Sequence, residues 1–512
     1  MNFVPHPNST LWIQKHCPDP ARGLTYCSDF GFDLRLMKLN SLLSVLVSVA
    51  ALAADGATPS WPGFRGPNCS GVSDGATPPV DISPTNSVLW KVQVPWSPSS
   101  PCIWDDQIFL TTFNDGELQT RCYRREDGKL SWTRGVKPEK VEMFHSTESS
   151  PAVPTPSTDG QKVVSYFGSF GLICYDCKGT ELWRHAMRLA QSLGGYGTAS
   201  SPLIAGNVVV VLRDQNYESS LLALDLRTGE KIWETPRPEA HGSFGSPILW
   251  RNNEVDEVIT PGSLRLKGYA LSTGAEDWQV QGTASFACTT PVVGDGVLYF
   301  GAWSNGKSDA PWPPWEQFLA KYDTSKHGFI SLDDMNPVMR DYMRGLDLNN
   351  DGKIDKAEWD AIQDNAAKGE NLLVAIKPGG HGDITQSHVA WKFTRGLPYV
   401  PSPVYYDGRI YLIKTGGMIS SVDAKTGTAY YTQERLEAAG DYYASPVAGG
   451  GKIYLASLEG KLTVVKAGGE KPEILHQADF GERILASPAL VGDKLYLRTQ
   501  STLYAFGPQA VQ

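Results

Sequence analysis

Runs of basic residues are missing from this sequence. Lysine and arginine number 46 against 55 acidic residues, which gives a formal net charge of −9, and no segment concentrates positive charge. Non-specific nucleic-acid binding needs a basic patch that neutralises phosphates, so we expect no nucleic-acid partner. The zinc motif H-E-x-x-H is also absent, no nucleophile motif supports catalysis, and we therefore assign no catalytic residues.

An apolar stretch long enough to span a bilayer is missing as well. The one membrane-like segment, Ser41–Ala54, has fourteen residues, whereas a spanning helix needs about 20. Lys38 precedes it, and Ala51-Leu52-Ala53 near its end fits a small-residue cleavage signal, which is typical of a secretory signal peptide that starts at Met37. We interpret residues 1–54 as an upstream extension plus signal peptide, and expect an exported chain, periplasmic or extracellular, without a transmembrane span. An uncleaved N-terminal anchor is the alternative.

Cysteine patterns typical of metal or redox sites are sparse. Cys174 and Cys177 form a single C-x-x-C, and no second such pair follows that would complete a zinc site. The pair also lacks the β-α-β context of a redox motif. We interpret both cysteines as ordinary strand and turn residues, with redox chemistry or metal binding as the alternative.

Glycine and proline are abundant, at 51 and 35 residues, and they accompany an internal repeat. Each unit opens with Ser-Pro or Thr-Pro, continues through short apolar strands and a Thr-Gly turn, and ends in a strand that often carries tryptophan. The openings are Ser100-Pro101, Ser150-Pro151, Ser201-Pro202, Ser246-Pro247, Thr290-Pro291, Ser402-Pro403, Ser445-Pro446 and Ser487-Pro488. Four strands in about 45 residues, repeated, predict an all-β propeller with eight blades. Seven blades is the alternative if one unit is degenerate.

Tryptophan recurs at one place in the unit, and the two chain ends complement each other. Trp132, Trp183, Trp233, Trp278 and Trp391 stand on the last strand of their units, where we expect them to pack between neighbouring blades. The last unit lacks this strand, and residues 88–94, with Trp90, supply it from the other end of the chain. The predicted propeller therefore comprises residues 87–303 and 371–512 and closes on itself.

The repeat over residues 61–507 resembles the quinoprotein-type, PQQ-like propeller repeat. The lead-in 55–86 contains Trp61–Pro67, WPGFRGP, which is similar to the opening of exported bacterial members. The resemblance implies either a quinone-dependent dehydrogenase or a scaffold without cofactor in outer-membrane assembly. The dehydrogenases typically carry adjacent cysteines against the quinone, and this sequence has no Cys-Cys pair. We therefore expect no PQQ and predict a binding or assembly scaffold, with a quinoprotein oxidoreductase as the alternative.

An acidic insertion, residues 304–370, interrupts the fifth unit and carries 13 acidic and 8 basic residues. Its segment 347–358 fits the calcium-loop pattern D-x-[DN]-x-[DN]-G-x₅-E, in which hard oxygen ligands surround one Ca²⁺ and a glycine permits the sharp turn. The predicted ligands are Asp347, Asn349, Asp351, the Lys353 carbonyl, Asp355 and Glu358.

Another loop, residues 323–334, precedes this one in the chain, so it is the first loop of the insertion and 347–358 is the second; together they resemble an EF-hand pair. Its ligand positions are Asp323, Ser325, His327, Phe329, Ser331 and Asp334. His327 replaces an oxygen ligand, and Asp334 is shorter than the usual glutamate, so we predict weak or absent metal binding there and structural support of the other loop.

The residues that lead into the innermost strands should surround one mouth of the central channel. Aromatic and polar residues gather there: Trp96, His145, Glu148, Tyr196, His241, Phe244, Phe286, Tyr399, Tyr442, Tyr443 and Arg483. Such a set can hold a protein segment, a peptide or a small molecule, although residues that only plug the channel and pack its rim are the alternative. Because the insertion joins the second and third strands of a blade, we expect it on this same face.

Overall fold

The computed structural model describes residues 60–508 except 217, 241, 253–254, 305–312, 337–338, 341–342, 344–345 and 348–350. The predicted extension and signal peptide, residues 1–54, lie outside these residues. In the part of the chain so described, no helix combines the length and apolar character needed to cross a membrane.

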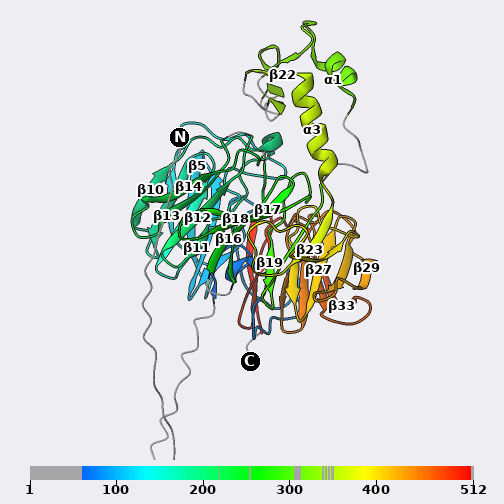
Figure 1. The fold of residues 1–512 in the computed structure, drawn as a ribbon. Helices are drawn as coiled ribbons and strands as arrows, with labels where there is room; N and C mark the ends of the chain where they lie inside the picture. Colours follow the sequence, from blue (N-terminus) through cyan, green and yellow to red (C-terminus); the bar gives the residue numbers. More distant parts are fainter. Residues whose placement is uncertain are drawn as a thin grey trace, which may run out of the picture. The chain divides into compact units, whose positions relative to one another are not determined.

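The architecture is an all-β propeller of eight antiparallel blades, which confirms the eight-bladed prediction over the seven-bladed alternative. Figure 1 shows the blades following one another in chain order. The first four blades are β3 (Cys102–Trp104), β4 (Gln107–Asn114), β5 (Glu117–Arg124), β6 (Leu130–Val136); β7 (Ser157–Thr158), β8 (Lys162–Phe167), β9 (Gly171–Asp176), β10 (Glu181–Ala186); β11 (Leu203–Ala205), β12 (Val208–Arg213), β13 (Ser220–Asp225), β14 (Lys231–Pro236); and β15 (Ile248–Asn252), β16 (Val255–Gly262), β17 (Arg265–Ala270), β18 (Glu276–Gln281).

The second half repeats this order, and its last blade is completed from the start of the chain. These blades are β19 (Val292–Gly294), β20 (Val297–Ala302), β23 (Leu372–Ile376), β25 (Val389–Phe393); β26 (Val404–Tyr406), β27 (Arg409–Lys414), β28 (Met418–Asp423), β29 (Ala429–Arg435); β30 (Val447–Gly449), β31 (Lys452–Ala456), β32 (Lys461–Lys466), β33 (Glu473–Asp479); and β34 (Ala489–Val491), β35 (Lys494–Arg498), β36 (Thr502–Phe506), β2 (Val88–Gln93). β2 pairs antiparallel with β36, so the ring closes and the outer edge of the last blade is a strand from the other chain end.

A ring of hydrogen bonds connects the first residues of the eight repeat openings. In each, the backbone N–H donates to the side-chain oxygen of the corresponding residue in the next blade, at 2.9 to 3.0 Å. The order is Ser100, Thr155, Ser201, Ser246, Thr290, Ser402, Ser445, Ser487 and back to Ser100. The sequence-based opening at Ser150 is therefore wrong: Thr155 occupies the position in blade two, because the link before this blade is longer.

Tryptophans join neighbouring blades, as the repeat predicts. Trp90, Trp132, Trp183, Trp233 and Trp391 each donate from Nε1 to the carbonyl that follows the third strand of the next blade, at 2.9 to 3.1 Å. The turn glycine of that blade lies against the same indole; a Cβ on Gly229, for example, would stand 2.6 Å from the Trp183 ring. Glycine is thus needed both for its positive φ, 73° at Gly229, and for close approach.

Trp278 also belongs to a core cluster that includes residues of the next blade, but its hydrogen bond is different, and a strand from blade five explains why. Its Nε1 donates to Glu257 within its own blade at 2.7 Å. The link between β23 and β25 contains β24 (Gly382–Asp383), which pairs in parallel with β18 and adds a fifth strand to blade four. The short glycine turn that receives each of the other tryptophans is replaced here by a longer link, residues 377–388, KPGGHGDITQSH.

The N-terminal lead-in crosses the inner strands of the propeller. β1 (Ser60–Trp61) pairs with β3 of blade one, and η1 (Pro67–Cys69) follows. Asn68 then exchanges two hydrogen bonds with Leu249 of blade four, at 2.7 and 2.8 Å, and the Gly71 carbonyl accepts from Ala448 of blade seven at 2.7 Å. The WPGFRGP motif therefore lies between opposite blades, in the middle of the ring.

The insertion in blade five has its own small core. It contains α1 (Trp315–Tyr322), β21 (Ile330–Ser331), η3 (Leu332–Asp334), β22 (Lys353–Ile354) and α3 (Lys356–Lys368). Phe318 and Trp359 stack with ring centroids 3.8 Å apart, and Ile330 pairs with Ile354 between the two loops. Hydrophobic packing inside the segment thus holds the two loops together.

Both ends of the insertion contact the link between blades four and five. Ser304 Oγ accepts from the Ser285 N–H at 3.1 Å, and the Glu370 N–H donates to the Gly282 carbonyl at 3.1 Å. The insertion therefore begins and ends on the face of the links that lead into the inner strands, which agrees with the expected face.

Candidate functional site

Aromatic side chains from successive links contact one another at the mouth of the channel. His145 stacks on Tyr196 with ring centroids 4.4 Å apart, and Tyr196 meets the Phe244 ring edge at 6.2 Å. Farther round the ring, Tyr399 contacts Phe286 and Trp303, at 6.2 and 5.6 Å. Tyr196 is 42% exposed, so part of this aromatic surface faces solvent.

Glu148 and Tyr443 lie at the same mouth. Burial raises the pKa of Tyr443 above its usual range, and the neighbouring Glu148 carboxylate raises it further. The pKa of Tyr399 is raised in the same way. Burial is the largest cause, and the nearby groups add to it: Cys288, Tyr196, Tyr443 and Glu148. Arg483 donates to the Thr147 carbonyl and so joins the link of blade eight to that of blade two.

Three of the predicted mouth residues are not among these contacts at the mouth. Tyr442 is 2% exposed and its hydroxyl donates to the Ala438 carbonyl at 2.8 Å, so it belongs to the core and Tyr443 takes its place at the mouth. Trp96 is half-buried in the link between β2 and β3. His241 lies outside the described residues.

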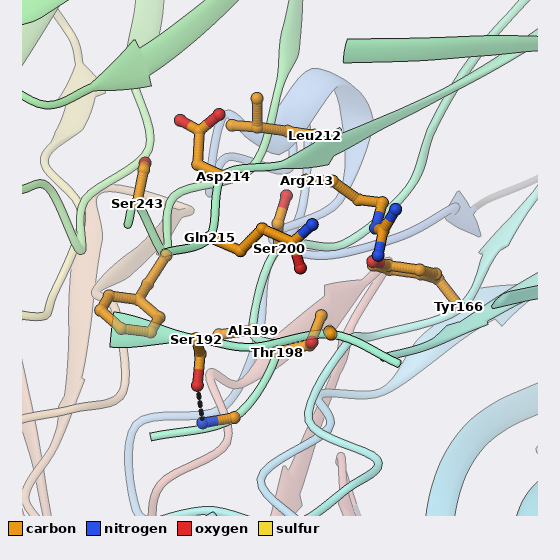
Figure 2. Close-up of a pocket in the computed structure, with 13 residues that line it drawn as sticks. Tyr166, Ser192, Thr198, Ala199, Ser200, Leu212, Arg213, Asp214, Gln215 and Ser243 are labelled. Atoms are coloured by element: carbon orange, nitrogen blue, oxygen red, sulfur yellow. Dashed lines mark hydrogen bonds between the residues drawn. The ribbon is translucent and has the colours of Figure 1, made fainter. Parts of the chain in front are cut away.

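A pocket adjoins the mouth at Phe244 (Figure 2). Its walls include Tyr166, Ser192, Thr198, Ser200, Arg213 and Gln215, from blades two and three and the link between them. Figure 2 shows the Arg213 guanidinium beside the Tyr166 hydroxyl, and Ser192 Oγ accepts from the Gly197 N–H at 2.6 Å. The pocket is polar at its walls and has one aromatic side, which suits a small polar group or a polar side chain.

Glu142 stands behind this pocket. It is 2% exposed, and its Oε2 accepts from both the N–H and the hydroxyl of Thr198, at 3.0 and 2.7 Å. Burial raises the pKa of Glu142 to about 8, although the Thr198 hydrogen bonds and the charge of Arg213 oppose this. No repeat or motif marks Glu142, Thr198 or Arg213, so the sequence analysis missed them.

The second loop of the insertion places two of its predicted ligands in buried positions. Asp347 is 6% exposed and accepts from the N–H groups of Asp351 and Gly352, at 3.1 and 2.9 Å. Glu358 is 7% exposed, and it exchanges hydrogen bonds with Asp355 at the start of α3. Gly352 has φ of 85°, the conformation that the tight loop requires.

The first loop is built alike but is more open. Asp323 accepts from the N–H groups of His327 and Gly328, at 3.0 and 2.8 Å. Ser325 donates to Asp334 at 2.8 Å, so two predicted ligand side chains bind each other. Phe329 stacks on His327, and Ser331 lies in β21. The Asp334 side chain is 37% exposed, in contrast to buried Glu358 in the other loop.

Metal binding in these loops remains an expectation. Asn349 lies outside the described residues, and the Lys353 backbone is in β22. Within the described ranges, no group of three or more His, Cys, Asp or Glu side chains is already drawn together as a metal site. The cation would therefore have to gather the Asp347, Asp351, Asp355 and Glu358 oxygens around itself.

The two cysteines of the C-x-x-C lie in different surroundings. Cys174 lies buried in β9, while Cys177 follows the strand and donates to the Gly160 carbonyl at 3.3 Å. Burial raises the pKa of the Cys174 thiol to about 12, which disfavours the thiolate that redox chemistry or metal binding needs.

One further sequence pattern falls at the start of the insertion. Residues 301–308, GAWSNGKS, fit the phosphate-binding pattern G-x-x-x-x-G-K-[ST]. The preceding strand β20 belongs to an antiparallel blade, whereas the phosphate loop requires a strand that leads directly into a helix. Residues 305–308 lie outside the described part, and we assign no site to this match.

Comparison with known proteins identifies a family model and several similar folds. The model described as outer membrane protein assembly factor BamB matches residues 120–312 and 347–510. BamB from Moraxella catarrhalis is 13% identical, with a TM-score of 0.52, over 82% of this chain and 98% of that one. No curated protein sequence matches the chain.

Two other structures show how widely this fold is used. Quinohemoprotein alcohol dehydrogenase from Comamonas testosteroni is 13% identical with a TM-score of 0.53, over 89% of this chain and 82% of that chain. The computationally designed Ika8 protein is 11% identical with a TM-score of 0.51, over 83% of this chain and 100% of its own. At these identities the likeness establishes the propeller fold alone.

Proposed function

This chain belongs to the family described as outer membrane protein assembly factor BamB, and from that premise we propose that it is an exported binding or assembly scaffold. The occupant that we propose for its channel mouth is a protein or peptide segment. The aromatic contacts of His145, Tyr196 and Phe244 carry this proposal, because such rings supply large contact area at low conformational cost. A small molecule in the adjoining pocket is the alternative occupant.

The test is capture of partners by the tagged chain, residues 55–512, expressed in the bacterial periplasm. The double variant Tyr196→Ala/Tyr399→Ala should retain at least about tenfold less of any protein that the wild type retains, as expected when hot-spot aromatics are truncated. Ile232→Ser on β14 is the control, because this side chain is 46% exposed and lies on the outer strand. Equal retention by the wild type and the double variant would contradict a docking role for the mouth.

A quinone-dependent oxidoreductase is the rival function. The adjacent cysteines typical of quinone-binding relatives have no counterpart here, since Cys288 at the mouth is followed by Thr289. These residues do not fit the quinone as the dehydrogenases hold it, and we derive no step through it. A quinone chromophore in the absorption spectrum of the purified chain would favour the rival.

We further propose that the insertion is an EF-hand pair that binds Ca²⁺ in its second loop. The observation that supports this is the burial of the Asp347 and Glu358 carboxylates, at loop positions 1 and 12, in a loop otherwise rich in oxygen ligands. A cation that gathers these buried carboxylates would neutralise them and so offset the cost of their burial. Calorimetric titration of the purified chain with Ca²⁺ is the direct test, and we expect one strong site.

Calcium binding in the insertion would affect the aromatic residues at the mouth, because both ends of the insertion contact that region. Ser304 contacts Ser285, whose neighbour Phe286 packs on Tyr399, and Trp303 contacts Tyr399 directly. We propose that Ca²⁺ stiffens the insertion and so steadies these rings. Replacing residues 305–369 by a short Gly-Ser bridge should leave the propeller folded and abolish the calcium dependence of partner binding. Calcium dependence that survives the deletion would place the regulatory metal elsewhere.

A further inference from the structure

Three arginines are completely buried in this propeller, and their guanidinium groups differ in how many of their hydrogen-bond donors have an acceptor. Arg237 is paired with the Asp214 carboxylate by two hydrogen bonds, at 2.7 and 2.9 Å. Arg498 has no such partner, but its two terminal nitrogens donate to the carbonyls of Pro95, Ser99 and Thr111. Arg65 has the poorest set: Nη2 alone donates, to Pro403 at 2.5 Å and to Ser70 at a longer 3.4 Å.

The remaining donors of Arg65 have no acceptor among the described residues. Its Nε and Nη1 atoms are buried and unpartnered, and so is Nε1 of Trp61 in the same WPGFRGP motif. All three atoms are donors, so what they lack is an acceptor. A buried donor left without one destabilises the folded state, and more so when it is charged.

No counter-charge in the described part of the chain compensates this guanidinium. Burial lowers the pKa of Arg65 to about 10, and the group that acts on it electrostatically is the Cys69 thiol. That thiol cannot serve as counter-ion, because burial raises its pKa to about 12 and leaves it neutral near pH 7. Arg65 itself remains protonated at that pH, so a full positive charge stands alone in the interior.

The surroundings of Arg65 restrict what could neutralise it. The residue is 0% exposed, on a segment that contacts blades one, four, six and seven, and a Cβ on neighbouring Gly66 or Gly71 would already clash. A side chain of another protein cannot reach a group so enclosed. A small ion can be trapped there when the propeller closes around the lead-in.

We propose that Arg65 holds a small inorganic anion, of the size of chloride, inside the channel of the propeller, with the anion accepting from its Nη1 or Nε. The site is separate from the mouth and from the calcium loops, and it serves stability. The anion supplies the acceptor and the charge that the chain lacks at this position. The anion thereby stabilises the lead-in segment in its position in the channel.

Bromide replaces chloride in such sites and can be located directly. The full mature chain, crystallised in sodium bromide, should show an anomalous peak within about 3.5 Å of Arg65 Nη1 or Nε. Water would also accept these hydrogen bonds, and it gives no anomalous signal. Crystals that show bromide elsewhere on the surface and none at Arg65 would overturn the proposal in favour of water.

A solution measurement tests the same site through linkage, since an anion that binds only the folded state raises the unfolding temperature with its concentration. Chloride should raise the unfolding temperature of the wild type relative to gluconate at constant ionic strength. Arg65→Met should abolish that difference, while the control Arg498→Met should keep it. An equal chloride effect in the wild type and Arg65→Met would contradict the proposal, and if Arg65→Met does not fold, the bromide peak in wild-type crystals decides.

Discussion

The backbone N–H of Ser487 donates to Oγ of Ser100 at 2.9 Å, across 387 residues of sequence. This bond completes a ring in which each blade donates one hydrogen bond to the next, so the first and last blades are joined as any two neighbours are. Every member is nearly inaccessible to solvent; Ser100, for example, is 2% exposed. The ring therefore holds the inner strands in register about the channel.

Loss of one member of this ring should destabilise the whole propeller. Ser100→Ala removes the acceptor and leaves the buried N–H of Ser487 without a partner, which should cost about 1–3 kcal/mol of unfolding free energy. Ser272→Ala is the control, because Ser272 is exposed on a turn, and its effect should stay within about 0.5 kcal/mol. Urea unfolding of the two variants measures the difference, and equal stabilities would show that the ring contributes nothing.

Calcium affinity should depend most on Glu358. Glu358→Gln removes one charge and the bidentate contact that closes a calcium loop, so the affinity should fall by about tenfold or more. Asp360→Asn is the matched control, since Asp360 lies one half-turn farther along α3 and pairs with Lys356 at 2.7 Å instead. Calorimetry compares the three proteins, and unchanged binding in Glu358→Gln would disprove the site.

The first loop should gain a metal when its defective ligand is repaired. His327→Asp restores an oxygen at loop position 5 and removes an imidazole that lies 3.9 Å from Asp334. The calcium stoichiometry should rise from one toward two per chain. An unchanged stoichiometry would mean that the Ser325–Asp334 hydrogen bond, rather than His327, keeps this loop from binding.

Glu142 should make stability fall as the pH rises. Its pKa is about 8 in the folded chain, against an ordinary value of 4.5, because it is buried. Between these two values the folded state holds a proton that the unfolded state has lost, so the group's stabilising contribution is complete below about pH 4.5 and is lost by about pH 8.

This prediction is checked by measuring the free energy of unfolding at pH 5, 6.5 and 8. The part of its decrease that Glu142 causes should be at most about 1.4 kcal/mol per pH unit. Glu142→Gln should flatten it, while Glu126→Gln, at an exposed position in blade one, should not. The same slope in Glu142→Gln and in the wild type would show that other groups cause the pH dependence.

The sequence by itself determined the eight-bladed ring, the tryptophan positions and the strand that closes it. These features were accessible because each blade is a local pattern of strands and turns, repeated at a nearly constant spacing. The calcium-loop pattern could also be recognised in the sequence, because it is local: all its ligands lie within twelve consecutive residues.

Only the tertiary structure decided which residues meet across the ring. It selected Thr155 over Ser150 and Tyr443 over Tyr442, because the path of a link, and not its composition, sets which of two neighbouring residues faces the channel. It also brought Glu142 to Thr198, 56 residues apart, and Arg65 to Pro403, 338 residues apart. Each of these contacts occurs once and does not repeat from blade to blade, so it leaves no periodic trace in the chain.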